Sequence, residues 1–432
     1  MLFYSLNNKE LKVSFQTALK RGLAPDNGLY FPEAIEPLPK DFFQKDLENL
    51  DEIDVAYNSI KQFISDEIPE DELKKIIKST ICFEFPIIEI NNSISALELF
   101  HGPTMAFKDV GARFMARCLG YFNRTSNEEI TVLVATSGDT GGAVANGFYK
   151  VPGIKVVILY PSGKVSNVQE KQLTTLGENI TALEVDGTFD DCQAFVKKAF
   201  LDKEINSSRK LTSANSINVG RWLPQMFYYL FAYMKLKNRY KELVFSVPCG
   251  NFGNVCAGVV AKKLGFPFKK FVASNNVNDV FVRFLNSSKY DPVKSIHTIS
   301  NAMDVGDPSN FVRILALHDY DINKVKKNIS AYSFSDPTTE DAIKEIYNET
   351  GYIADPHGAI GYLGCKEYLK KNPNAHTIFL ETAHPSKFLE VVEKILDRNI
   401  IIPPQIQAVI KKQKFAKKVK NYDDFRSKLS LI

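Results

Sequence analysis

Apolar residues along this chain gather in short continuous runs, and a helical pattern follows most of these runs. Residues 130–136 (ITVLVAT), 154–160 (IKVVILY), 243–247 (LVFSV) and 377–380 (TIFL) are such runs. Continuous apolar runs, rather than alternating ones, are typical of parallel strands that are buried on both faces. Because helical segments alternate with these strands, the pattern predicts an α/β protein with mainly parallel sheets flanked by helices.

Three further segments bear on where the protein resides. Residues 222–236 form the most apolar segment, but they include Lys235, so we interpret them as a buried helix and not as a membrane span. The N-terminal segment is charged at Lys9 and Glu10, where a signal peptide needs an apolar run, so we expect a cytoplasmic protein. Residues 411–420 (KKQKFAKKVK) are basic, and we interpret them as a helix with one solvated face.

The length and charge of the chain indicate how many domains it has and which binding partners are excluded. A chain of 432 residues is too long for one ordinary core and indicates two or three domains. Lys and Arg outnumber Asp and Glu by 54 to 50, an excess too small to indicate binding to nucleic acid or to a membrane. The six cysteines form no C-x-x-C pair, so we expect reduced thiols and no metal site.

Several predicted strands end in segments rich in Gly, Ser, Thr or Asn, which then lead into helices. The carboxyl ends of such strands and the N-termini of helices converge on one crevice, where free N–H groups suit anions. One such segment consists of Gly250, Asn251, Phe252, Gly253 and Asn254. It matches neither the phosphate-binding Walker loop nor the dinucleotide fingerprint. A tight turn without a ligand therefore remains an alternative to an anion-binding loop.

A second segment of this kind follows residues 130–136 and contains Ser137, Gly138, Asp139 and Thr140. Ser, Thr and Asp are ordinary helix caps, so a plain cap is the structural alternative. Three glycines and several hydroxyl groups are more than a cap requires. We therefore consider this segment a candidate for binding a substrate carboxylate.

Two remaining segments carry one candidate side chain each. Lys108 follows apolar Met105, Ala106 and Phe107, and a lysine in an apolar pocket loses its charge readily, which suits Schiff-base chemistry. A surface lysine is the alternative. Thr382 ends a predicted strand and can present one hydroxyl group, whereas His384 nearby is interpreted as a residue that starts a helix.

Together, a Schiff-base lysine, an anion loop, a carboxylate loop and a hydroxyl group are the parts that a pyridoxal-phosphate site needs. The segments HGPTMAFKD, ATSGDTGGAVA, PSGKVSNVQ, TSANSINVGR, VPCGNFGN and ETAHPSKF resemble, in the same order, segments of the threonine synthases. RGLAPDNGLYFP resembles the N-terminal signature of that family, so the resemblance covers nearly the whole chain. It implies a fold-type II pyridoxal-phosphate enzyme, similar to the tryptophan synthase β chain, of the long microbial and fungal branch with an extra N-terminal domain.

The resemblance implies a role for each matching residue. Lys108 would form the Schiff base with the cofactor, and Thr382 would face the pyridine nitrogen. Gly250, Asn251, Phe252, Gly253 and Asn254 would hold the cofactor phosphate, and Ser137, Gly138, Asp139 and Thr140 the substrate carboxylate. Cys249 departs from the family, where Thr or Ala is more usual, but a loop that acts through its backbone should tolerate it.

The implied activity is that of a pyridoxal-phosphate-dependent carbon–oxygen lyase, which converts O-phospho-L-homoserine and water to L-threonine and phosphate. The substrate phosphate needs a second anion site, because the glycine loop holds that of the cofactor. The candidate cations are Arg113, Lys164, Arg221 and Lys387, with Asn215, Ser216 and Asn218 as neutral donors. We expect two of the four cations to contact phosphate; the alternative is that several pair with surface carboxylates.

The long form of the family implies an N-terminal domain of residues 1–92, a large cofactor-binding domain of 93–115 and 215–432, and a small mobile domain of 116–214. We expect a monomer or a weak homodimer. A related phospho-lyase that releases 2-oxobutyrate from the same substrate would use the same motifs. A non-catalytic binding protein on this fold is the other alternative, although such proteins usually lack the lysine that is present here as Lys108.

Overall fold

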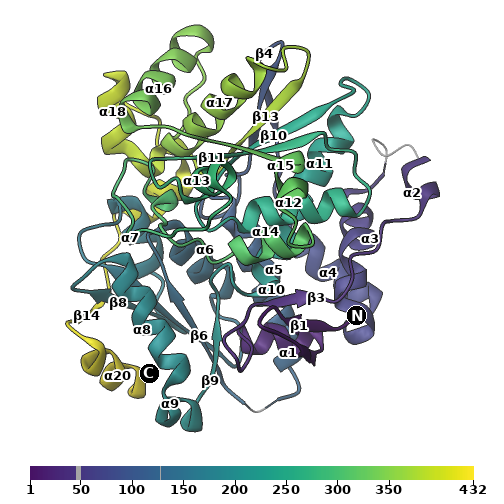
Figure 1. The fold of residues 1–432 in the computed structure, drawn as a ribbon. Coiled ribbons are helices and arrows are strands. Elements are labelled where there is room, and N and C mark those ends of the chain that lie inside the picture. Colours follow the sequence, from purple (N-terminus) through teal and green to yellow (C-terminus); the bar gives the residue numbers. More distant parts are fainter. Residues whose placement is uncertain (45–49, 127) are drawn as a thin grey trace. The chain divides into compact units, whose positions relative to one another are not determined.

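The computed structural model describes residues 1–44, 50–126 and 128–432, which form two compact units (Figure 1). The three domains expected from the sequence stay a prediction, whereas packing between segments distant in the sequence defines these two units. The C-terminal strand, for example, pairs with a strand formed by residues 180–185, far earlier in the chain. The first unit comprises Met1–Pro32, Gly102–Arg221 and Ile402–Ile432, and the second unit comprises Glu33–His101 and Trp222–Ile401.

The first unit is built on a five-stranded sheet in the order β14-β8-β7-β6-β9, in which all pairs are parallel. Every residue of β6 is buried, as the continuous apolar run predicts. The strands are β6 (Ile130–Ala135), β7 (Ile154–Pro161), β8 (Ile180–Val185), β9 (Lys210–Ser213) and β14 (Lys417–Val419). The helices are α5 (Lys108–Asn123), α6 (Asp139–Phe148), α7 (Asn167–Thr174), α8 (Phe189–Leu201), α9 (Lys203–Ser208), α19 (Pro404–Ile410) and α20 (Tyr422–Ser430).

The N-terminal residues add a small antiparallel sheet to the first unit. Its order is β2-β1-β3, with strands β1 (Phe3–Ser5), β2 (Asn8–Val13) and β3 (Tyr30–Pro32). Helix α1 (Phe15–Arg21) packs against β9 and α5, and the rings of Phe15 and Phe122 lie 6.2 Å apart. This packing explains why Met1–Pro32 belong to the first unit.

The second unit is built on a six-stranded sheet in the order β12-β11-β10-β13-β5-β4. All its pairs are parallel except that of β4 with β5. The strands are β4 (Ile87–Asn91), β5 (Ile94–Glu98), β10 (Leu243–Pro248), β11 (Lys270–Asn275), β12 (Ile329–Ser333) and β13 (His376–Glu381). The helices are α2 (Lys40–Gln44), α3 (Glu52–Ile64), α4 (Glu70–Thr80), α11 (Met226–Leu236), α12 (Gly253–Lys263), α13 (Val280–Ser287), α14 (Phe311–Leu317), α15 (Ile322–Asn328), α16 (Asp336–Thr350), α17 (Pro356–Leu369) and α18 (Leu389–Leu396).

Helix α17 packs closely on this sheet because its glycines face the strands. A Cβ added at Gly361 would lie 3.1 Å from the side chain of Phe379 in β13, and one at Gly364 would lie 1.9 Å from Oγ of Ser274 in β11. Larger residues at these positions would push the helix away from the sheet. The N-terminus of α17 is thereby held near the carboxyl ends of the central strands.

The structure confirms the predicted α/β class and each of the four predicted buried strands. Residues 222–236 are helical, as predicted, but they comprise the last residue of a short helix, α10 (Val219–Trp222), a 3₁₀ helix, η3 (Leu223–Gln225), and α11. No helix among the described residues is long and apolar enough to cross a membrane.

The interpretation of residues 411–420 as a helix was wrong. Helix α19 ends at Ile410, and the segment instead supplies β14, whose Val419 is buried in the core of the first unit. Lys414 binds Glu170 at 2.6 Å and Glu184 at 2.9 Å. A charge pattern alone cannot reveal strand pairing across more than 200 residues of sequence, and that pairing decides the structure here.

Candidate active site

Lys108 is the first residue of α5, and a tight turn fixes its position. Thr104 donates to the carboxylate of Asp109 from its backbone N–H at 2.9 Å and from its hydroxyl group at 2.6 Å. Met105 within this turn adopts a left-handed conformation, with φ of 56°. The side chain of Lys108 is 16% exposed, so it is largely shielded from water yet accessible to a ligand.

The structure brings Lys108 and the predicted carboxylate loop together within the first unit. Nζ of Lys108 lies 3.7 Å from Oδ2 of Asp139, whose side chain is only 3% exposed. Gln169 donates from Nε2 to Oδ1 of Asp139 at 3.0 Å. The buried carboxylate therefore faces the amine and has its other oxygen fixed by a neutral donor. A carboxylate at this distance attracts a charged amine.

The loop of residues 137–140 leads into α6 through an unusual backbone. Gly138 has φ of 136°, and a Cβ at this position would lie 2.4 Å from the side chain of Gln169. The hydroxyl oxygen of Thr136 accepts the N–H groups of Gly138 and Gly141. Gly138, the residue before α6, has no side chain to cap it, and Thr136 satisfies only the N–H of Gly141 in the first turn, so the N–H groups before Gly141 can meet an anion. The carboxylate of Asp139 is directed to Lys108, so its backbone, and not its side chain, is what could meet a substrate carboxylate.

The predicted cations and neutral donors of the first unit differ in their surroundings. Lys164 is exposed in the loop between β7 and α7, and Arg113 is half-buried in α5. Arg221 is buried and donates to the carbonyl oxygen of Ala214. Asn218 is fully buried, and its amide group binds backbone groups of Leu19 and Gly220, each at 2.9 Å. Their roles toward substrate stay predictions. Arg221 and Asn218 thus bind backbone groups of the first unit, whereas Lys164 and Arg113 are at least partly exposed to solvent.

Asn215 and Ser216 complete the predicted donors. The amide group of Asn215 binds both the N–H and the carbonyl oxygen of Ala135, at 3.2 and 2.8 Å. Asn215 therefore fixes the end of β6, the strand that leads into the carboxylate loop. Ser216 lies between Asn215 and Asn218 and is partly exposed.

In the second unit, the glycine loop joins β10 to α12 and presents backbone donors. Phe252 adopts a left-handed conformation with φ of 61°, and its ring packs 4.8 Å from that of Phe281. Helix α12 begins at Gly253, and the side chain of Phe252 before it makes no capping hydrogen bond. Oδ1 of Asn251 accepts the N–H of Ser309 at 3.1 Å, so this bond uses the acceptor of the amide group and not its donor. This donor set fits a phosphate group.

Asn254 shapes this loop. Its Nδ2 donates to the carbonyl oxygen of Pro248 at 2.9 Å, and Tyr229 donates from its hydroxyl group to the carbonyl oxygen of Asn254 at 2.9 Å. Gly250 has no room for a side chain, because a Cβ there would lie 2.7 Å from the carbonyl oxygen of Ala302. Asn254 therefore binds the loop to the end of β10. The absence of a side chain at Gly250 lets the loop contact the turn that contains Ala302.

Thr382 directly follows β13, which lies beside β10 in the sheet. Neighbouring strands are about 4.8 Å apart, so the glycine loop and Thr382 start from adjacent strand ends. Thr382 is 6% exposed, and the predicted cation Lys387 is fully buried in a short 3₁₀ helix, η5 (Pro385–Phe388). His384 caps that helix by accepting the N–H of Ser386, and burial lowers its pKa to about 4. The interpretation of His384 as a helix-start residue is thus confirmed.

Sequence reasoning missed two groups of residues. Gln169 contacts Asp139, but its sequence signal was a capping box with Ser166, which predicts a helix start and not that contact. The buried residues Asp355, His357 and Glu381 also lie close to one another. The segment DPHG suggests a cap followed by proline, but no local pattern ties it to a strand end more than 20 residues away.

Comparisons with known proteins agree with this geometry. A family model described as "Pyridoxal-phosphate dependent enzyme" matches residues 79–380, one described as "Threonine synthase N terminus" matches 2–81, and one described as "Threonine synthase, C-terminal" matches 358–427. A threonine synthase of Buchnera aphidicola from Acyrthosiphon pisum is 45% identical over 412 residues, which cover 94% of each chain.

Solved structures are similar over the full length. The crystal structure of threonine synthase from Escherichia coli has a TM-score of 0.94 and 39% identity, with 100% of each chain covered. The structure of a threonine synthase from Brucella melitensis with bound pyridoxal phosphate has a TM-score of 0.91 and 31% identity, with 99% of this chain and 98% of that chain covered.

Proposed function

The chain belongs to the threonine synthase family of pyridoxal-phosphate-dependent enzymes, and we propose that its substrate is O-phospho-L-homoserine, which it converts with water to L-threonine and phosphate. The observation that carries this proposal is the pair formed by Lys108 and the buried Asp139, which lies at the entrance to α6. There, a reactive amine adjoins uncapped N–H groups that suit the carboxylate of an amino-acid substrate.

Pyridoxal phosphate, when bound, supplies the electron sink for the reaction. The protein supplies the proton transfers, which we assign to the amine of Lys108 acting as general base and then as general acid at the α and β carbons of the substrate. Asp139 favours the protonated amine, and Gln169 keeps the carboxylate in place. This pair lets Lys108 hold a proton between one transfer and the next.

The remaining roles follow from the residues of each unit. In the second unit, the N–H groups of Gly253 and its neighbours would bind the cofactor phosphate, and the hydroxyl group of Thr382 would meet the pyridine nitrogen. A hydroxyl group does not enforce a protonated nitrogen as a carboxylate would. In the first unit, accessible Lys164 and Arg113 are our choice for the substrate phosphate, because Arg221 is engaged with a backbone carbonyl group.

Product analysis with the purified protein tests this proposal. Incubation with O-phospho-L-homoserine should release threonine and phosphate in equal amounts, and Lys108→Ala should lower kcat by at least about 10³-fold. Borohydride treatment followed by peptide mapping should fix the cofactor on the peptide that contains Lys108. Release of 2-oxobutyrate in place of threonine would show the related lyase activity, and binding without turnover would show a non-catalytic protein.

We also propose that the protein is a cytoplasmic monomer or weak homodimer. The proposal is supported by membership of the threonine synthase family, and the long form of that family is the basis for the expected assembly. Sedimentation at several protein concentrations and imaging of the tagged full chain would test the two parts separately.

A further inference from the structure

The glycine loop of the second unit rests on a turn that the sequence motifs did not single out. This turn comprises residues 298–305 and contains a short 3₁₀ helix, η4 (Asn301–Met303). A Cβ added at Gly250 would lie 2.7 Å from the carbonyl oxygen of Ala302 and 3.2 Å from Cα of Met303. Because the two backbones are in direct contact, the position of the turn sets the position of the loop.

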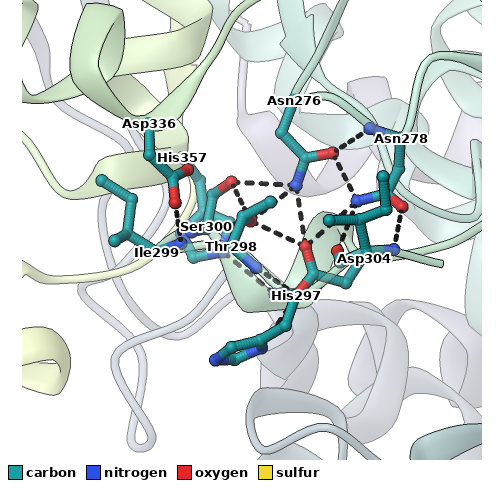
Figure 2. Close-up of polar contacts among 11 residues, drawn as sticks. Asn276, Asn278, His297, Thr298, Ile299, Ser300, Asp304, Asp336 and His357 are labelled. Atoms are coloured by element: carbon teal, nitrogen blue, oxygen red, sulfur yellow. Dashed lines mark hydrogen bonds and ion pairs between the residues drawn. The ribbon is translucent and has the colours of Figure 1, made fainter.

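Polar side chains, most of them buried, hold this turn in place (Figure 2). Asp304 accepts the N–H of Thr298 at 3.0 Å and its hydroxyl group at 2.7 Å. Asn276, which follows β11, donates from Nδ2 to Asp304 at 2.9 Å and to the hydroxyl oxygen of Ser300 at 3.0 Å. The turn is therefore tied to the end of the strand that neighbours β10.

A second connection leaves the turn through His357, near the start of α17. The N–H of Ala302 donates to Nε2 of His357 at 3.3 Å, so the ring carries its hydrogen on Nδ1. That hydrogen is donated to Asp355, with Nδ1 and Oδ1 2.5 Å apart. His357 is 2% exposed, and Asp355 is fully buried. Each ring nitrogen thus has one defined partner, and these partners lie on two different segments.

The connection continues to the strand end that carries Thr382. The backbone N–H of Asp355 donates to Oε1 of Glu381 at 2.6 Å, and Glu381 directly precedes Thr382. The carboxyl group of Glu381 fills the space that a side chain at position 358 would need, because a Cβ at Gly358 would lie 1.7 Å from Oε2. An unbroken line of contacts therefore runs from Gly250 through Ala302 to the buried residues His357, Asp355 and Glu381.

We propose that His357 is a positioning residue that holds the glycine loop at a fixed distance from Thr382, so that both ends of bound pyridoxal phosphate meet their partners. The inference rests on the roles proposed above for the glycine loop and Thr382. The ring of His357 is the rigid member of the line, and it sets this distance through its two nitrogens. Its loss would let the turn behind Gly250 shift while the strands stay in place.

Two substitutions test the contributions of the two ring nitrogens separately. His357→Gln can place an oxygen near the position of Nε2 and still accept the N–H of Ala302. His357→Asn can keep a donor near Nδ1 for Asp355 but cannot reach Ala302. The matched control is His376→Asn, at the opposite end of β13, where a buried histidine binds Ser95 at 3.0 Å and stacks on Tyr240.

The measurement is the dissociation constant of pyridoxal phosphate, obtained by absorbance titration of the cofactor-free proteins, with melting temperatures recorded alongside. We expect His357→Asn to raise the constant about tenfold, and His357→Gln to stay within about threefold of wild type. His376→Asn should lower the melting temperature without changing the constant. Equal constants for both His357 variants, or a wild-type constant for His357→Asn, would overturn the inference.

The proposed function is judged by a different readout. A wild-type protein that bound the cofactor but made no threonine would end the proposed function, and the split between the His357 variants would still support the positioning role. A wild-type protein that bound no pyridoxal phosphate would overturn both.

Discussion

The two units place different kinds of group where we expect the chemistry. In the first unit, Lys108 and Asp139 are opposite charges 3.7 Å apart, and a neutral amide group fixes the carboxylate. In the second unit, the glycine loop and Thr382 offer backbone N–H groups and one hydroxyl group, all uncharged, and buried hydrogen bonds hold them. A charged pair can change its protonation state during a reaction, whereas neutral donors can only hold a ligand. We therefore expect substitutions in the first unit to lower kcat and those in the second to weaken cofactor binding.

After the loss of Lys108 itself, the largest effect should follow from removing the charge of Asp139. Asp139→Asn keeps the size of the side chain but no longer stabilises the protonated amine of Lys108, so kcat should fall between about 10- and 100-fold. The dissociation constant of pyridoxal phosphate should change little. Steady-state kinetics and an absorbance titration measure the two quantities. Asp191→Asn, at the start of α8 in the same unit, serves as the control and should leave kcat unchanged. An Asp139→Asn variant with normal kcat and weak cofactor binding would contradict the expected difference between the two units.

The opposite result is expected at the glycine loop. Gly250→Ala adds a Cβ that would lie 2.7 Å from the carbonyl oxygen of Ala302, so the loop must move. We expect cofactor affinity to fall about tenfold, with kcat at saturating cofactor nearly unchanged. Gly351→Ala is a useful comparison, because its φ of 75° makes alanine strained while the space around it is open. That control should lose stability only. An unchanged affinity in Gly250→Ala would show that the loop does not depend on this close contact.

The acidic residue behind Thr382 should give the second unit a characteristic dependence on pH. Burial, together with the charge of Asp355, raises the pKa of Glu381 well above its usual value of about 4.3. Between that value and the raised pKa, the folded state keeps a proton that the unfolded state releases, so stability falls as pH rises. The slope is at most about 1.4 kcal/mol per pH unit.

Glu381→Gln removes this titration without changing the shape of the side chain. The variant should therefore gain melting temperature relative to wild type as pH rises from about 5 to 8. Thermal unfolding at several pH values measures this difference. A difference in melting temperature that stays constant over this range would show that Glu381 is ionised in the folded protein. The second unit would then contain a buried charge beside Thr382.

The sequence predicted the strands and the loops well because both signals are local. Each buried strand is a continuous apolar run, and each loop is a cluster of glycine and hydroxyl residues at the end of such a run. The contacts that hold the loops are not local. Gln169 reaches Asp139 across 30 residues, and His357 reaches Ala302 across 55. Periodicity and spacing carry no information on such pairs, nor on the hydrogen bond from the amide group of Asn218 to the carbonyl oxygen of Leu19.

The smallest expected effect concerns the C-terminal segment. It tests whether charges of the first unit beyond the pair of Lys108 and Asp139 affect the reaction. Lys414 bridges Glu170, which adjoins Gln169 in α7, and Glu184 in β8. Lys414→Met should lower the free energy of unfolding by no more than about 1 kcal/mol, because the lysine side chain is 31% exposed and water screens its charge.

Chemical denaturation and kcat should be measured side by side, with exposed Lys411→Met as the control. We expect kcat to stay at the wild-type value in both variants, because the backbone of α7 holds Gln169 without help from Lys414. A fall in kcat comparable to that of Asp139→Asn would mean that the contact between Gln169 and Asp139 depends on the C-terminal segment. The groups that affect the reaction would then extend from Lys108 through α7 to the segment that precedes β14. Their charges would act as one network rather than as one pair.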